Sequence, residues 1–189
     1  MNLLREYIGR LLDKQQVNIL IPPQPSDEKR VKELSTIQSQ MRNPYNSLEV
    51  QDDLDKNMTK LFNNIIKMSG NPGQKSLIKK LKNEIKPNII FHKDFFNAER
   101  PQELASRLGI SFAADDLDSA KSPSYPSGHT TQAFYLALVL SRLYPNLKNQ
   151  FFILANMIAK SRIDRGVHFP SDLEAGKILA LTLYRRKFQ

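Results

Sequence analysis

Apolar side chains recur every three or four residues along most of this chain, which is the spacing of amphipathic helices. Clusters of proline, glycine and serine, such as "IPPQPSD" and "SGNPG", separate the helical segments. No stretch alternates long enough to predict a β-strand. The expected helices cover residues 1–17, 28–41, 48–69, 74–85, 88–99, 101–108, 128–144, 147–162 and 171–186.

The two most apolar segments, 128–144 and 147–162, are expected at the centre of the fold, with more polar helices around them. The sequence therefore predicts an all-α protein, a single-domain helical bundle over residues 1–189. Within it, residues 1–25 are expected to form an N-terminal helix and a proline-rich arm.

The longest apolar runs, "AFYLALVL" and "FFILA", are much shorter than the ~20 apolar residues of a membrane-spanning helix. The first residues, "MNLLREYIGRLLDKQQ", carry charges throughout and lack the apolar core of a signal peptide. We therefore expect a soluble protein with no membrane span, whose most apolar helices are buried in protein.

Lysine and arginine number 28 against 19 aspartates and glutamates, which gives a net charge of +9. This balance favours anionic partners, which include phosphorylated small molecules, nucleic acid and anionic membrane surfaces, and it equally fits a basic protein with none of these. The chain has no cysteine, so disulfides and thiolate metal sites are excluded.

Three short clusters could carry chemistry, and the first is "KDFFNAERP". Lys93 and Arg100 are seven residues apart, which would place both cations on one helical face, two turns apart. The same spacing is also common on a solvated basic helix face.

The second cluster, "PSGHT", stands where the helix over 128–144 is expected to begin. The backbone N–H groups of Ser127 and Gly128 would lack intrahelical acceptors there, and the positive end of the helix dipole also favours an anion. His129 would project from the first turn beside that anion. An ordinary serine N-cap with an incidental histidine is the alternative.

The third cluster, "SRIDRGVHFPSD", contains Arg162, His168 and Asp172. A carboxylate four residues after a histidine can accept a hydrogen bond from one imidazole nitrogen and leave the other as the better nucleophile. A helix-capping aspartate beside a surface histidine would give the same pattern.

Together the clusters supply every group that phosphoryl transfer needs. Arg162 would join the other two cations in binding the phosphate oxygens, and Ser127 and Gly128 would add neutral donors. His168 would attack phosphorus, Asp172 would orient it, and His129 would protonate the departing oxygen.

The order Lys-x6-Arg-Pro, Pro-Ser-Gly-His and Ser-Arg-x5-His-x3-Asp resembles the signature of the type 2 phosphatidate phosphatase superfamily. That superfamily includes class A bacterial non-specific acid phosphatases, lipid phosphatases and vanadium haloperoxidases. "PSYPSGHT" is most similar to the motif of the class A acid phosphatases, with Pro123 replacing its first glycine. The matching positions are Lys93, Arg100, Pro101, Pro126, Ser127, Gly128, His129, Ser161, Arg162, His168 and Asp172.

The resemblance implies a metal-independent histidine acid phosphatase with its active site in residues 88–186. Its substrate would be a small phosphomonoester, its intermediate a phosphohistidine, and it would need no cofactor. Transfer of the phosphoryl group to a second alcohol and assembly into a homo-oligomer such as a dimer also follow from the resemblance. Class A enzymes are usually exported, so the protein is expected to be cytoplasmic if the chain is complete, and periplasmic or secreted if a signal was removed.

Other functions remain open at this point. A vanadate-dependent haloperoxidase would use the same oxyanion site, and a peripheral lipid phosphatase would need no span of its own. A basic nucleic-acid-binding module is the alternative from a different class, although no motif for it is visible and no nucleic-acid partner is expected.

Overall fold

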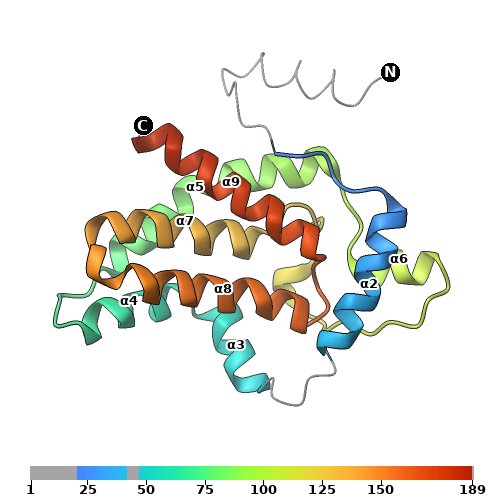
Figure 1. The fold of residues 1–189 in the computed structure, drawn as a ribbon, viewed down its shortest axis with the longest axis horizontal. Coiled ribbons are helices and arrows are strands. Elements are labelled where there is room, and N and C mark those ends of the chain that lie inside the picture. The colour runs from blue at the N-terminus through green and yellow to red at the C-terminus, as the bar shows by residue number, and fades with distance from the viewer. Residues whose placement is uncertain (1–20, 42–46, 189) are drawn as a thin grey trace.

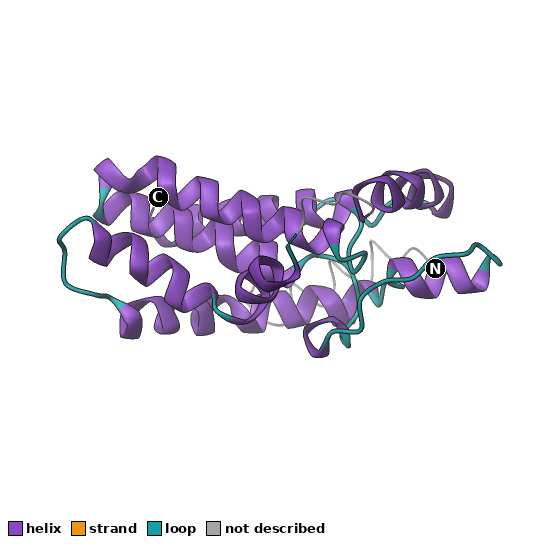
Figure 2. Cartoon of the chain, turned by 90° about the horizontal axis from the view of Figure 1, so that it is seen from below, coloured by secondary structure: helices purple, strands orange, loops and turns teal. Residues whose placement is uncertain are grey.

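A computed structural model of the chain describes residues 21–41 and 47–188 (Figure 1). The expected helix over 1–17 lies outside these described residues. Within them every regular element is helical and no strand occurs (Figure 2), which confirms the all-α prediction. The elements are α2 (Asp27–Met41), α3 (Leu48–Lys56), α4 (Met58–Met68), α5 (Lys75–Phe96), α6 (Pro101–Arg107), η1 (Asp118–Ala120), α7 (Gly128–Leu143), η2 (Pro145–Leu147), α8 (Lys148–Asp164) and α9 (Pro170–Phe188).

Helix α7 is the central element of the fold. It packs most extensively against α8 and α9, between which it lies in Figure 1, and it also contacts α5. Its residues Leu136 and Leu140 are fully buried, as expected for the most apolar run of the chain. Helix α9 packs against α7 as extensively as α8 does, although the sequence of α9 is less apolar than that of α8. The sequence did not predict this central position of α9.

A second apolar cluster at one end of the molecule joins α2, α6 and the ends of α8 and α9. Leu34 and Ile37 of α2 pack there with Leu104 of α6 and with Phe169, which follows α8. This packing fixes α6 beside the segment between α8 and α9, and so brings together residues far apart in the sequence.

Two predicted divisions between helices were wrong. The segment 48–69 forms two helices, because α3 ends at Lys56 and Asn57 separates it from α4. Helix α5, in contrast, continues through Pro87, where an interruption was predicted. Pro87 is exposed, so its missing N–H costs a hydrogen bond only on the solvent side, and burial of the opposite face holds the helix together.

None of the helices in the described ranges combines the length and apolarity that crossing a bilayer requires.

We expect Ile158→Ala in α8 to lower the free energy of unfolding by about 2–5 kcal/mol, because it removes a fully buried side chain from a packed core. Ile153→Ala in the same helix is the matched control, because Ile153 is 60 % exposed and should change stability by only about 0.5 kcal/mol. Urea unfolding of both variants measures the difference, and equal losses would contradict this placement of α8.

Candidate active site

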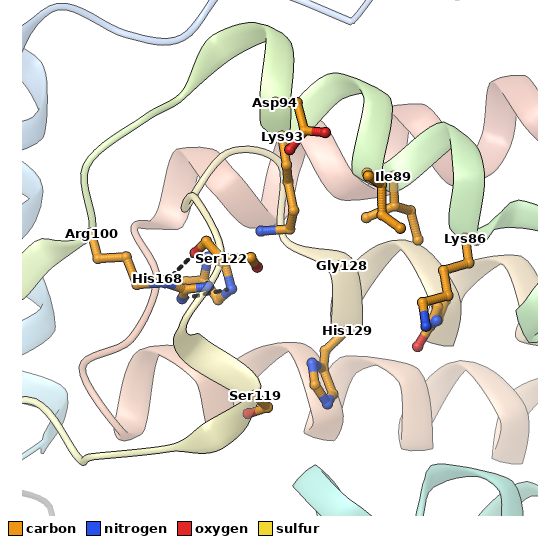
Figure 3. A pocket seen from close by; sticks show the side chains of 12 residues that line it. Lys86, Ile89, Lys93, Asp94, Arg100, Ser119, Ser122, Gly128, His129 and His168 are labelled. Atoms are coloured by element: carbon orange, nitrogen blue, oxygen red, sulfur yellow. Dashed lines mark hydrogen bonds between the residues drawn. The ribbon is translucent and has the colours of Figure 1, made fainter.

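A cavity of about 260 Å³ opens between α5, the start of α6, the start of α7 and the segment between α8 and α9 (Figure 3). Of the residues singled out in the sequence, Lys93, Arg100, Gly128, His129 and His168 line it. The remaining ones, Ser127, Arg162 and Asp172, are almost fully buried and do not line the cavity.

Arg100 reaches the cavity from a different element than predicted. Helix α5 ends at Phe96 with Asn97 in the left-handed conformation, so Lys93 and Arg100 do not share a helical face. Arg100 is instead the N-cap of α6, in the extended conformation that a following proline favours. Its Nη1 lies 3.3 Å from His168 Nε2 and donates to the carbonyl of Val167 over 2.6 Å.

Lys93 is held by backbone carbonyls rather than by a carboxylate. Its Nζ donates to the carbonyl of Pro123 and lies 3.4 Å from that of Ser124. Burial and the neighbouring Arg100 charge lower the pKa of Lys93 to about 7. Position 123, where the octet departs from the acid phosphatase motif, therefore contributes a backbone oxygen that any residue could supply.

His168 is fixed by one buried carboxylate oxygen. Its Nδ1 lies 2.9 Å from Oδ2 of Asp172, which also accepts from the Phe169 N–H over 3.0 Å and from Ser124 Oγ over 2.6 Å. Burial raises the pKa of Asp172. Asp172 thus caps α9 and orients His168 with the same atom. The capping part of the alternative is therefore present, but its surface histidine is wrong, because His168 is buried.

This arrangement turns Nε2 of His168 toward Arg100 and the cavity. Burial, followed by the charges of Arg100 and Lys93, lowers the pKa of His168 well below its usual value. The imidazole is therefore neutral near pH 7, with a lone pair on the nitrogen that faces the cavity.

A tight turn delivers His168 to this position. Gly166 has φ +70°, which favours glycine. The N–H groups of Gly166 and Val167 donate to the carbonyls of Ile163 and Arg162 over 2.8 Å and 3.1 Å. The turn ends α8 in the manner of a Schellman motif and sets the direction of the following residues.

The N-terminus of α7 has fewer free backbone N–H groups than the sequence predicted. The Ser127 N–H donates to the backbone carbonyl of Asp172 over 3.0 Å, and Ser127 Oγ caps the helix by accepting from the Thr130 N–H. Gly128 lines the cavity, and for its N–H no acceptor is recorded within the described residues. A Cβ at Gly128 would stand 3.3 Å from Ile89 Cγ2, so α5 and α7 could not approach as closely with a larger residue.

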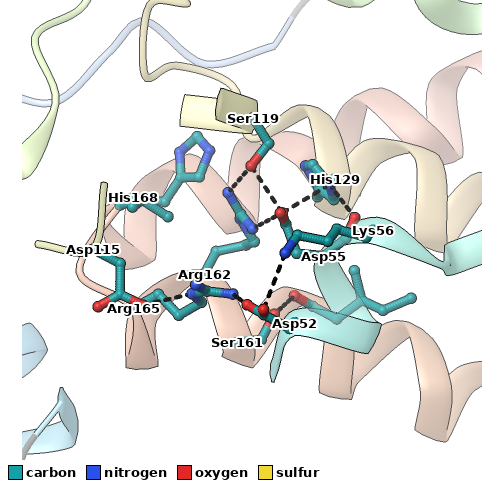
Figure 4. Close-up of polar contacts among 12 residues, drawn as sticks. Asp52, Asp55, Lys56, Asp115, Ser119, His129, Ser161, Arg162, Arg165 and His168 are labelled. Atoms are coloured by element: carbon teal, nitrogen blue, oxygen red, sulfur yellow. Dashed lines mark hydrogen bonds and ion pairs between the residues drawn. The ribbon is translucent and has the colours of Figure 1, made fainter. Parts of the chain in front are cut away.

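His129 has a partner that the sequence did not reveal. Its Nε2 lies 3.1 Å from the backbone carbonyl of Asp55 and 3.3 Å from Oδ1 of the same residue (Figure 4). A carbonyl only accepts, so Nε2 carries a hydrogen. Burial and the Arg162 charge lower the pKa of His129 to about 4, although Asp55 acts in the opposite direction.

Asp55 also pairs with Arg162, which is fully buried. Arg162 Nη1 donates to Asp55 Oδ1, Nη2 donates to Ser119 Oγ over 3.1 Å, and Ser119 Oγ donates to Asp55 over 2.8 Å (Figure 4). Burial raises the pKa of Asp55, but the Arg162 guanidinium, the Ser119 hydrogen bond and His129 together outweigh this effect and keep the pKa below its ordinary value. The Nε of Arg162 has no partner among the described residues.

One signal in the sequence could have pointed to Asp55. In the sequence it falls at helical spacing with Gln51, Met58 and Phe62, which are buried, and an acidic residue at such a position needs a buried partner. The identity of that partner, 107 residues away, is a matter of tertiary structure. The role of Ser124, which donates to Asp172, was not predicted for a similar reason: it depends on the approach of α9.

Among the described residues, no group of three or more His, Cys, Asp or Glu side chains is arranged to hold a metal ion.

Comparison with known proteins places residues 80–186 in a known family. A family model described as the PAP2 superfamily matches residues 80–186. An acid phosphatase of Zymomonas mobilis is 42 % identical over 60 residues, or 32 % of this chain and 23 % of that protein. A non-specific acid phosphatase of Providencia stuartii is 38 % identical over 61 residues, or 32 % of this chain and 25 % of that protein. The matched part of the chain thus spans about a quarter of the length of these relatives.

A solved structure shares the fold of this chain. It is the crystal structure of the first transmembrane PAP2 type phosphatidylglycerolphosphate phosphatase from Bacillus subtilis, with a TM-score of 0.53. The match covers 99 % of this chain and 97 % of that one at 16 % identity, so it concerns the fold alone.

We expect Asp55→Ala to lower the free energy of unfolding by about 3–5 kcal/mol, because it leaves the buried Arg162 guanidinium without its carboxylate. Asp52→Ala in the same helix is the control, because Asp52 is 46 % exposed and its partner Arg165 retains Asp115. Its cost should be less than about 1 kcal/mol. Denaturant unfolding in phosphate-free buffer measures both, and a similar cost for the two variants would refute the structural role of the Asp55–Arg162 pair.

Proposed function

The chain belongs to the PAP2 superfamily, and from that membership we propose that it is an acid phosphatase that hydrolyses phosphomonoesters through a phosphohistidine on His168. The observation that carries the proposal is the buried contact of 2.9 Å between His168 Nδ1 and Asp172 Oδ2, which leaves Nε2, 3.3 Å from Arg100 Nη1, as the nitrogen that faces the cavity. The acid phosphatases among its relatives support the same reaction class.

In the first step the lone pair of His168 Nε2 forms a bond to phosphorus while the ester P–O bond breaks. Asp172 holds the Nδ1 hydrogen and stabilises the positive charge that develops on the ring. The lowered pKa of His168 keeps it neutral and therefore nucleophilic before the substrate binds. In the second step water takes the place of the alcohol, and the N–P bond breaks to release phosphate.

The charge on the transferring phosphoryl group would be held mainly by Lys93 and Arg100, whose side chains line the cavity, together with the N–H of Gly128. Arg162, which pairs with Asp55 and does not line the cavity, would act through its positive charge rather than through a direct contact with the phosphoryl group. Ser127 would act indirectly, because its N–H is already bonded to Asp172 and its Oγ caps α7.

His129 is proposed as the general acid that protonates the leaving oxygen and as the base that later takes a proton from water. With a pKa of about 4 in the free protein, His129 is neutral near pH 7. A dianionic phosphate in the cavity would favour the imidazolium and raise that pKa. Substrate binding would therefore protonate His129. Because the pKa of His129 in the free protein is low, we expect an acidic pH optimum.

No metal ion or cofactor enters these steps. The proposed substrate is a small phosphomonoester that reaches the cavity from water.

The direct test is a panel of phosphomonoesters assayed with EDTA present. We expect the protein to release phosphate, and His168→Ala to lose at least about 10³-fold in kcat, because no other group can take the place of the nucleophile. Ser106→Ala, on the exposed side of α6, is the control and should keep its activity. Loss of wild-type activity in EDTA would overturn the metal-free mechanism, and full activity of His168→Ala would overturn the assignment of the nucleophile.

Sulfate tests the proton loading of His129 separately from catalysis, because it remains a dianion between pH 5 and 8. Calorimetric titration at pH 6, repeated in buffers of different ionisation enthalpy, should show uptake of up to about one proton per bound sulfate. Because the pKa of His129 would be higher in the sulfate complex than in the free protein, the affinity for sulfate should fall as the pH rises. His129→Gln should remove most of the uptake at pH 6, where Lys93, with a pKa of about 7, is already largely protonated. An unchanged uptake in that variant would remove this role from His129.

A further inference from the structure

The cavity extends well beyond the groups proposed to bind phosphate. Its volume is about 260 Å³, whereas one water molecule takes about 30 Å³ in the liquid, so a leaving group of several atoms fits beside the phosphoryl group. Away from Arg100 and His168 the lining continues along α5 toward Lys86, one turn before Ile90, and along α7 to Gln132, one turn after Gly128. This outer end is where the leaving group of a bound substrate would lie.

Lys86 marks the far limit of that outer end. In Figure 3 it lies on the opposite side of the cavity from Arg100 and His168. Lys86 and Lys93 stand on the same face of α5, seven residues apart, which corresponds to about 10 Å along the helix axis. The cavity thus has a cation at each end, with Ile89 and Ile90 of the same helix between them.

The positive charge at the outer end is not neutralised by the protein. Lys82 stands one turn before Lys86 on α5, and no hydrogen bond or ion pair is recorded for either side chain within the described part of the chain. Burial and the charge of Lys86 lower the pKa of Lys82. The nearby Glu84 is already used elsewhere, because it accepts from Tyr135 and pairs with Lys187.

The carboxylate that does line the cavity lies at its other end. Asp94 follows Lys93 directly in the sequence, two turns of α5 away from Lys86. The outer end therefore presents a cation and the amide of Gln132, which can donate two hydrogen bonds, beside an aliphatic wall.

We propose that this outer end, formed by Lys86, Gln132 and Ile90, is a subsite for a second anionic group of the substrate. The preferred substrates would be phosphomonoesters whose leaving group carries a phosphate or carboxylate about 7–10 Å from the reacting phosphorus, a span set by the helical rise between the two lysines. This inference rests on the proposed phosphatase function, because it names the substrate class of the same site. Ile90 is 45 % exposed and would cover the carbons that join the two anionic groups.

Two synthetic esters test the subsite directly: butane-1,4-diol bisphosphate and butyl phosphate. The bisphosphate has two equivalent ends, so a twofold advantage in kcat/KM is statistical. The wild-type protein should prefer it about five- to tenfold, because one additional partly exposed charge pair is worth about 1 kcal/mol or less. The preference should shrink as ionic strength rises, because salt screens an exposed pair.

Lys86→Gln should reduce the ratio of the two kcat/KM values to about the statistical twofold. Lys148→Gln is the matched control: it removes the same charge from the exposed first turn of α8, at the opposite end of that helix from Arg162, and should keep the wild-type ratio. A wild-type ratio of two, or an equal drop in both variants, would overturn the subsite while leaving the phosphatase function intact. If the wild-type protein hydrolyses neither ester, the phosphatase function is overturned, and the subsite with it.

Discussion

Burial of positive charge around one cavity is the constraint on which the site depends. Lys93, Arg100 and Arg162 are each at most 7 % exposed, and burial lowers the pKa of all three. Among the described residues the buried carboxylates next to these cations are Asp55 and Asp172, and each is already engaged by other groups. A bound dianion would replace the missing counter-charge, so the same groups that cost stability in the free protein favour phosphate binding.

Asp172 shows how closely the fold and the proposed chemistry are joined. Its Oδ2 accepts from the Phe169 N–H at the start of α9 and holds Nδ1 of His168, while its backbone carbonyl accepts from Ser127 at the start of α7. The starts of the two helices are therefore tied together through the residue that orients His168. Asp55 also connects separate helices, because it joins α3 to Arg162 of α8 and to His129 of α7.

The sequence predicted the parts of this arrangement that local spacing determines. The four-residue step from His168 to Asp172, the helix start at Gly128 and the apolar run of α7 all follow from short-range rules. The partners of His129 and Arg162 could not be found in this way, because Asp55 is distant in sequence from both. The arrival of Arg100 from α6 was missed because the left-handed Asn97 ends α5 earlier than the apolar pattern indicated. The occupied N–H of Ser127 depends on the approach of α9, which no local rule describes.

Identifying the residue that carries the phosphoryl group during turnover decides whether His168 is the nucleophile. Rapid mixing with a phosphomonoester, an alkaline quench that preserves phosphohistidine, and mass spectrometry of the peptides would identify the modified residue. The account predicts a phosphoryl group on Nε2 of His168, formed as fast as the first alcohol is released. A phosphoryl group on any other side chain, formed at that rate, would contradict it.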